Sequence, residues 1–125
     1  MNRESSTIGV AVITKNEVDR IGRLLKSVEF ANEILVVDSG STDGTQEICR
    51  RMGAKVVYNE WPGFGPQKQF AMDQIRSEWI LNLDADEEVS MELADEMIKA
   101  VGNADPQVNG FSIPRLSKYL KRWIR

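Results

Sequence analysis

The sequence contains no histidine, and its only cysteine is Cys49. Without histidine there can be no Ser–His triad, no imidazole general base and no zinc site of the usual kind. A single cysteine forms neither an intrachain disulfide nor a cysteine-rich metal centre. Any metal bound by this chain must therefore be a hard ion held by oxygen ligands, such as Mg²⁺ or Mn²⁺.

Long apolar runs are missing as well. No stretch approaches the roughly 20 residues needed to span a bilayer, and the opening MNRESSTIGV has no apolar segment of signal-peptide length. These absences predict a cytoplasmic protein. With 125 residues, 42% hydrophobic and 28% charged, the composition indicates one soluble globular domain with a substantial core.

The charges are distributed unevenly. All 19 acidic residues lie within residues 1–114, whereas the last segment, RLSKYLKRWIR, carries basic charges only. Residues 1–114 are too acidic to suit the binding of duplex nucleic acid. On a helix, the basic residues of 115–125 would share one broad face, which suits peripheral association with an anionic membrane or substrate. The alternative is that 115–125 begins a further region, so we divide the chain into 1–114 and 115–125.

Alternating apolar patterns predict an α/β fold. Runs rich in β-branched residues predict strands at Thr7–Thr14, Glu33–Asp38, Ala54–Tyr58 and Trp79–Asp84, with a weaker one at 108–114. Spacings of three and four predict helices at about 17–28 and 44–52, one after Pro66, and one that Ser90 caps and Gly102 ends. The last helix should bury Leu93, Ala94, Met97, Ile98 and Val101. We therefore expect a mostly parallel, Rossmann-like sheet flanked by helices.

Three of these strands end in polar segments, namely TKNE (14–17), DSGSTDGT (38–45) and DADEE (84–88). Ligands of open parallel sheets bind outside the carboxyl ends of the strands. The three segments should therefore meet at one edge of the sheet and form a binding site there.

Asp84 and Asp86 indicate a cation site within that edge. In an extended segment, carboxylates two residues apart point to the same side, and their repulsion favours a divalent cation or a raised pKa. The alternative is that Asp86, Glu87 and Glu88 only complement the positive end of the following helix. We expect Asp84 and Asp86 to form the site, and Glu87 and Glu88 to be helix-entrance charges.

The other two segments also contain candidate ligand contacts. Asp38 is placed to accept hydrogen bonds from a base or ribose, because a turn with a helix cap explains Thr42 or Asp43 but not Asp38. Gly40 permits a positive φ or close backbone approach. Lys68, at the start of a helix, is either a surface lysine or a contact for an anionic or nucleobase ligand, and Lys15 is open to the same two interpretations.

Together these segments resemble the N-terminal half of family 2 glycosyltransferases with the GT-A fold. The likeness covers essentially the whole chain, is closest to bacterial lipopolysaccharide-core glucosyltransferases, and includes RWIR near residue 125. The motifs that carry it, in order, are VITKNEVDRIGRLLKSV, ILVVDSGSTDGTQEI, GFGPQKQFAM and WILNLDADEEVS.

The resemblance implies inverting transfer of a hexose, glucose first of all, from a nucleotide sugar such as UDP-hexose to a lipopolysaccharide-core or related saccharide or glycolipid acceptor. It also implies Mn²⁺ or Mg²⁺ as cofactor. Asp86 would ligate the ion that bridges the diphosphate, and Asp84 would contact the ribose or the metal shell. The metal would stabilise the leaving diphosphate as a Lewis acid.

By the same resemblance, Thr14 and Glu17 would line the nucleoside pocket, Asp38 would bind the base, and Lys68 would lie near the nucleotide. Glu17 can also be an ordinary first-turn helix acid.

The sequence departs from the family pattern at the catalytic base. The family's general base is an acidic residue of a later, acceptor-side part, whereas no acid follows Asp105 in this sequence. We therefore expect a truncated domain that carries the donor-binding half, with its catalytic base not found. Asp84 and Glu87 are poor substitutes because both lie in the metal cluster. The alternatives are a non-catalytic nucleotide-sugar-binding module or an interaction domain that docks on membranes or partners.

Overall fold

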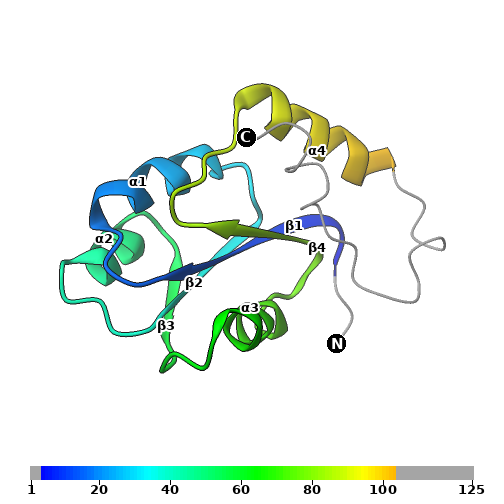
Figure 1. Ribbon diagram of the computed structural model, residues 1–125. Coiled ribbons are helices and arrows are strands. Elements are labelled where there is room, and N and C mark those ends of the chain that lie inside the picture. The colour runs from blue at the N-terminus through cyan, green and yellow to red at the C-terminus, as the bar shows by residue number, and fades with distance from the viewer. Residues whose placement is uncertain (1–3, 104–125) are drawn as a thin grey trace.

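The computed structural model describes residues 4–103, which form alternating strands and helices (Figure 1). The elements are β1 (Glu4–Thr14), α1 (Val18–Ser27), β2 (Glu33–Asp38), α2 (Thr45–Arg51), β3 (Lys55–Tyr58), α3 (Phe64–Asp73), β4 (Ser77–Asp84) and α4 (Met91–Asn103). The strand predicted at 108–114 and the basic segment 115–125 lie outside the described residues. Within the described part, no helix has the length and apolar character needed to cross a bilayer.

The four strands form one parallel sheet in the order β3-β2-β1-β4. In its register, Thr14 pairs with Asp38 on one side of β1, and Ile13 pairs with Asp84 on the other. The carboxyl ends of β1, β2 and β4 therefore coincide, which confirms the prediction that their polar segments share one edge of the sheet.

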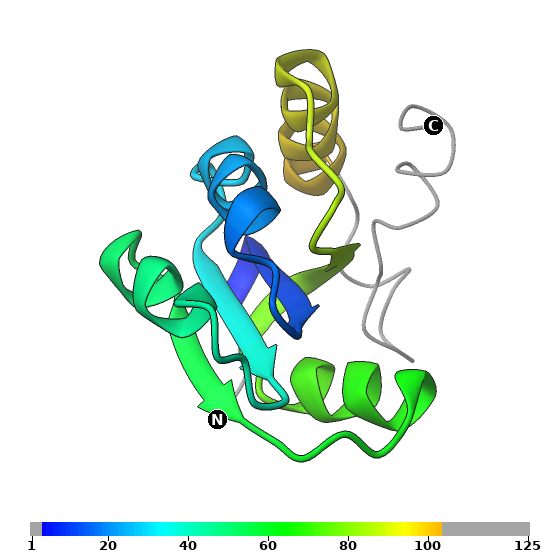
Figure 2. The ribbon, with the colours of Figure 1, turned by 60° about the vertical axis from the view of Figure 1, so that its left-hand side comes forward.

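Helices cover both faces of the sheet, and Figure 2 shows α3 alone on the face opposite α1, α2 and α4. Alternate residues of each central strand enter the two cores, because successive side chains of a strand point to opposite faces. Val10, Val12 and Leu81 pack toward α1, α2 and α4. Ala11, Val37 and Ile80 pack toward α3. Burial on both faces accounts for the nearly continuous apolar runs of β1 and β2.

The helix bounds differ from the predicted ones in two places. Helix α3 begins before Pro66, which lies in the first turn, where its missing N–H leaves no hydrogen bond unmade. Helix α4 continues past Gly102 to Asn103, so Gly102 does not end it.

The predicted cap of α4 is confirmed, because the Leu93 amide donates to Ser90 Oγ at 3.0 Å. The inward placement of Ile98 is wrong, since this side chain is 47% exposed. Leu93, Met97 and Val101, each one turn apart, form the buried stripe instead.

Candidate functional site at the carboxyl edge of the sheet

Asp38 and Thr14 form a buried polar pair at the ends of β2 and β1. Thr14 Oγ1 donates to Asp38 Oδ1 at 2.7 Å, and both residues are buried. The carboxylate of Asp38 also accepts hydrogen bonds from the Gly40 and Ser41 amides, the Ser41 hydroxyl and the Gln46 side chain. Five donors from the protein itself therefore converge on one carboxylate.

This environment stabilises the ionised form of Asp38. Burial alone would raise its pKa, but the hydrogen bonds from Ser41, Thr14 and Gln46 outweigh burial and lower the pKa from 3.8 to about 2. The expectation that a turn does not explain Asp38 is wrong, because its carboxylate accepts the hydrogen bonds that order the 38–45 loop. The expected positive φ of Gly40 is confirmed at 114°.

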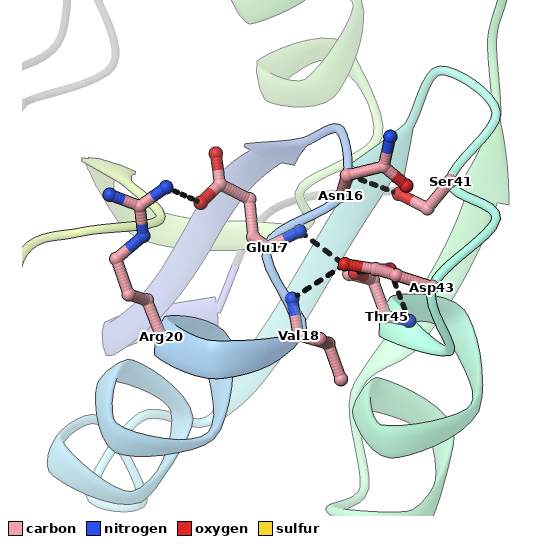
Figure 3. A network of polar contacts seen from close by, with 7 residues as sticks. All are labelled: Asn16, Glu17, Val18, Arg20, Ser41, Asp43 and Thr45. Atoms are coloured by element: carbon pink, nitrogen blue, oxygen red, sulfur yellow. Dashed lines mark hydrogen bonds and ion pairs between the residues drawn. The ribbon is translucent and has the colours of Figure 1, made fainter.

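The 14–17 and 38–45 segments are joined by hydrogen bonds in both directions, and Figure 3 shows those donated by the Asn16 and Glu17 amides. The Asn16 amide donates to Ser41 Oγ at 2.7 Å, and the Thr42 amide donates to Asn16 Oδ1 at 2.8 Å. The Glu17 amide donates to Thr45 Oγ1 at 2.9 Å. Asn16 has a φ of 56°, a conformation that asparagine tolerates better than most residues. The two loops thus form one connected surface.

Two charged residues strengthen the same junction. Asp43 accepts hydrogen bonds from the Val18 amide of α1 and from the Thr45 amide of α2, at 3.1 and 3.0 Å. The Thr45 hydroxyl is the main cause of its lowered pKa. Asp43 thus stabilises the starts of both helices, although Gly44 holds the N-cap position of α2. Lys15 Nζ donates to the Gly40 carbonyl at 3.1 Å, so its described contact is with the protein.

Asp84 is the last residue of β4, and Asp86 lies in the turn that follows, so the two do not share one extended segment. The Glu87 amide donates to the Asp84 carbonyl at 2.9 Å and closes the turn, so the geometric premise of the i, i+2 argument is wrong. The Glu87 side chain accepts a hydrogen bond from the Asp84 amide at 2.7 Å. Because α4 begins only at Met91, Glu87 is not a helix-entrance charge. Burial, together with the nearby Asp84 and Asp86, raises the pKa of Glu87.

An open cleft of about 280 Å³ lies beside this turn. Its lining comes from the ends of β1 and β4 and the starts of α1 and α3: Ile13, Glu17, Arg20, Phe64, Asp84, Ala85 and Asp86. Arg20 forms an ion pair with Glu17 Oε1 at 2.8 Å (Figure 3). Lys68 Nζ lies 3.7 Å from Asp84 Oδ1, so Lys68 belongs to the neighbourhood of the cleft.

The structure therefore divides the predicted site residues into two groups. Glu17, Asp84 and Asp86 line the cleft, and Lys68 pairs with one of them. Thr14 and Asp38 form their own pair at the neighbouring strand ends and do not line it.

The acidic residues of the cleft suit a hard divalent ion. Asp84 and Asp86 are both exposed and supply carboxylate oxygens, which are the preferred ligands of Mg²⁺ and Mn²⁺. Among residues 4–103, no group of three or more acidic or cysteine side chains could hold a metal ion by itself. An ion at this turn would thus take its remaining ligands from phosphate or water, as Mg²⁺ commonly does.

Four lining residues were not predicted, namely Ile13, Ala85, Arg20 and Phe64, and the last two carry the chemically distinctive side chains. Arg20 follows Glu17 at i+3, a spacing that also occurs in ordinary surface ion pairs of helices. Phe64 stands in the turn-rich WPGFGPQK segment, where an aromatic residue between glycines was the available signal. Neither pattern reveals a cleft, because the cleft depends on how α1 and α3 are placed around β4.

Comparison with known proteins identifies related sequences. The chain is 52% identical over 91 residues to an uncharacterized glycosyltransferase of Rickettsia bellii, covering 72% of this chain and 31% of the relative. It is 34% identical over 109 residues to the lipopolysaccharide core biosynthesis glycosyltransferase LpsC of Rhizobium meliloti, covering 83% and 40%. The chain thus spans about a third of the length of these relatives.

Solved structures share the fold. The S. aureus TarS 1–349 structure matches with a TM-score of 0.66 and 28% identity, over 77% of this chain and 32% of that one. Glucosyl-3-phosphoglycerate synthase from Mycobacterium tuberculosis, in complex with Mn²⁺, UDP and glucosyl-3-phosphoglycerate, matches with a TM-score of 0.65 and 23% identity, over 79% and 40%. The model of glycosyl transferase family 2 matches residues 9–125. The chain, with its GT-A type of parallel sheet, therefore belongs to glycosyl transferase family 2.

Proposed function

We propose that this chain carries the donor-binding half of an inverting glycosyltransferase that uses UDP-hexose, with glucose as the first candidate sugar. The acceptor would be a lipopolysaccharide-core or related saccharide or glycolipid. The observation that carries the proposal is the cleft in which Glu17, Asp84 and Asp86 meet at the carboxyl ends of β1 and β4. The names of LpsC and of the UDP- and Mn²⁺-bound mycobacterial synthase support the acceptor and the donor, respectively.

Asp86 and Asp84 would hold Mn²⁺ or Mg²⁺ through their carboxylates. When bound, such an ion stabilises the negative charge of the leaving diphosphate. Lys68 keeps the Asp84 carboxylate in place through their 3.7 Å ion pair. It also brings a positive charge to the side of the cleft where an anionic diphosphate would lie.

The nucleoside would lie between the 14–17 and 38–45 loops and the cleft. Glu17 lines the cleft and is available to the ribose side. Asp38 and Thr14 would fix the shape of the base-binding loop, because their polar atoms are already bonded to each other and to that loop. We place the general base on the acceptor side, since Glu87 lies beside Asp84, to which we assign the metal.

Calorimetric titration of the chain with UDP, with and without Mn²⁺, tests the proposal. We expect Mn²⁺-dependent binding, and we expect Asp86→Asn to weaken it at least tenfold while the melting temperature stays unchanged, because Asp86 is exposed. Glu88→Gln is the matched control: it removes an exposed neighbouring charge that does not line the cleft. If UDP and other nucleoside diphosphates fail to bind, or if both variants bind alike, the assignment is wrong.

Two further measurements address the finer parts of the proposal. Assays of hexose transfer and of slow donor hydrolysis distinguish an enzyme from a non-catalytic nucleotide-sugar-binding module. We propose a cytoplasmic protein that meets the membrane surface through residues 115–125. Flotation with anionic liposomes should then require this segment, and equal flotation after its removal would contradict the idea.

A further inference from the structure

An exposed aromatic pair, Trp61 and Phe64, contributes one of its rings to the lining of the cleft. Phe64, the first residue of α3, is 68% exposed and lines the cleft, and Trp61 is 47% exposed. Their ring centroids lie 4.9 Å apart, and the rings are nearly perpendicular at 87°. An edge-to-face contact of this kind occupies at most one face of either ring. At least one face of Phe64 therefore remains open to a ligand.

Hydrogen bonds fix the backbone segment that carries this aromatic pair. Asn59 Nδ2 donates to Gln67 Oε1 at 2.7 Å, and Gln67 Nε2 donates to the Asn59 carbonyl at 3.1 Å. Gln67 is fully buried, so these hydrogen bonds fix the connection from β3 to α3 on which Phe64 stands. Stacking surfaces work best when they are ordered before the ligand arrives, because less entropy is lost on binding.

Phe64 also shares a helix face with a charged residue of the site. Phe64 and Lys68 are four residues apart in α3 and so lie one turn from each other on the same side. Lys68 pairs with Asp84, and Asp84 lines the same cleft as Phe64. This face of α3 thus combines a flat apolar ring with a cation beside the carboxylates.

We propose that the open face of Phe64 is the surface on which the nucleobase of the donor stacks, with Trp61 supporting the ring from the side. The proposal rests on the proposed function. Phe64 shares the cleft with Glu17, which we assign to the ribose side, so the ring meets the nucleoside part of the donor. Stacking on an aromatic ring is available to every base, because each has a π-face.

Calorimetric titrations of the chain with UDP, GDP, ADP and UDP-glucose in Mn²⁺ test this proposal. We expect Phe64→Ala to weaken UDP and UDP-glucose by the same factor, about tenfold or more, and to affect the other nucleotides similarly if they bind. Phe64→Trp should retain the affinity. Phe64→Leu, which keeps apolar bulk but lacks a π-face, should lose most of it.

Met52→Ala is the control, since Met52 is an exposed apolar residue that does not line the cleft. Unchanged UDP affinity in Phe64→Ala would overturn the proposal. So would a loss confined to UDP-glucose, which would place the ring against the sugar, or full affinity in Phe64→Leu. If the unaltered chain binds none of these nucleotides, the proposed function itself fails, and the inference fails with it.

Discussion

Residues of the same type have opposite roles at this edge of the sheet. Asp38 is fully buried and accepts hydrogen bonds from five donors of its own chain. The side chain of Asp84 is 54% exposed and has a lysine at 3.7 Å. The first carboxylate holds a loop of its own chain, whereas the second keeps the exposure that the proposed metal site requires. The sequence cannot separate them, because both simply follow an apolar strand.

The environment of Asp38 predicts a particular dependence of stability on pH. The pKa of Asp38 falls from 3.8 in the unfolded chain to about 2 in the folded one. The ionised carboxylate therefore adds about 2 kcal/mol to the free energy of unfolding, in full above about pH 4. This stabilisation is lost as the pH falls through 2. Asp38→Asn should lower the free energy of unfolding at pH 6. It should also remove the decrease in this free energy that Asp38 causes as the pH falls from about 4 to 2.

Urea unfolding between pH 2 and pH 6 measures the effect as a difference between variant and unaltered chain. The matched control is Asp95→Asn, which removes an exposed carboxylate of α4. A profile of Asp38→Asn that runs parallel to that of the unaltered chain would show that Asp38 is not the titrating group.

At the level of elements, the sequence predicted the order and type of all the described strands and helices. Apolar periodicity carries that information directly, and the rule for parallel sheets brought three polar segments to one edge. The hydrogen bonds that join these segments could not be predicted. They connect residues about 25 positions apart, such as Asn16 and Ser41, and depend on the register of β1 against β2.

The junction of the 14–17 and 38–45 loops can be tested at Asn16. Asn16→Ala should destabilise the fold by about 1–2 kcal/mol, because alanine is strained at a φ of 56° and cannot accept the hydrogen bond from Thr42. Asn16→Asp keeps both the acceptor and the tolerance of this conformation, so it should remain close to the unaltered chain. Chemical denaturation compares the two, and equal losses would contradict the argument.

Across the whole molecule, the site depends on helices from opposite faces of one sheet. The cleft takes Glu17 and Arg20 from the α1 side and Phe64 from α3, which Figure 2 shows on the other face. The sequence predicted the layers but not the cleft, because the positions of α1 and α3 at the edge are set by side-chain packing. Gly9 is one such packing position, since a Cβ there would lie 2.5 Å from Ile75 Cγ2.

Gly9→Ala should therefore force the segment after α3 away from β1 and destabilise the fold by about 1–3 kcal/mol. The branched side chain of Ile75 cannot yield cheaply, since Cγ2 is attached next to its backbone. Ile75→Ala makes room for the added methyl, so the double variant should be more stable than the sum of the single effects predicts. Gly65→Ala in α3 meets no atom within 4 Å and should be neutral or stabilising. Urea unfolding of the four variants measures this coupling, and strictly additive losses would mean that Gly9 does not set the spacing between α3 and the sheet.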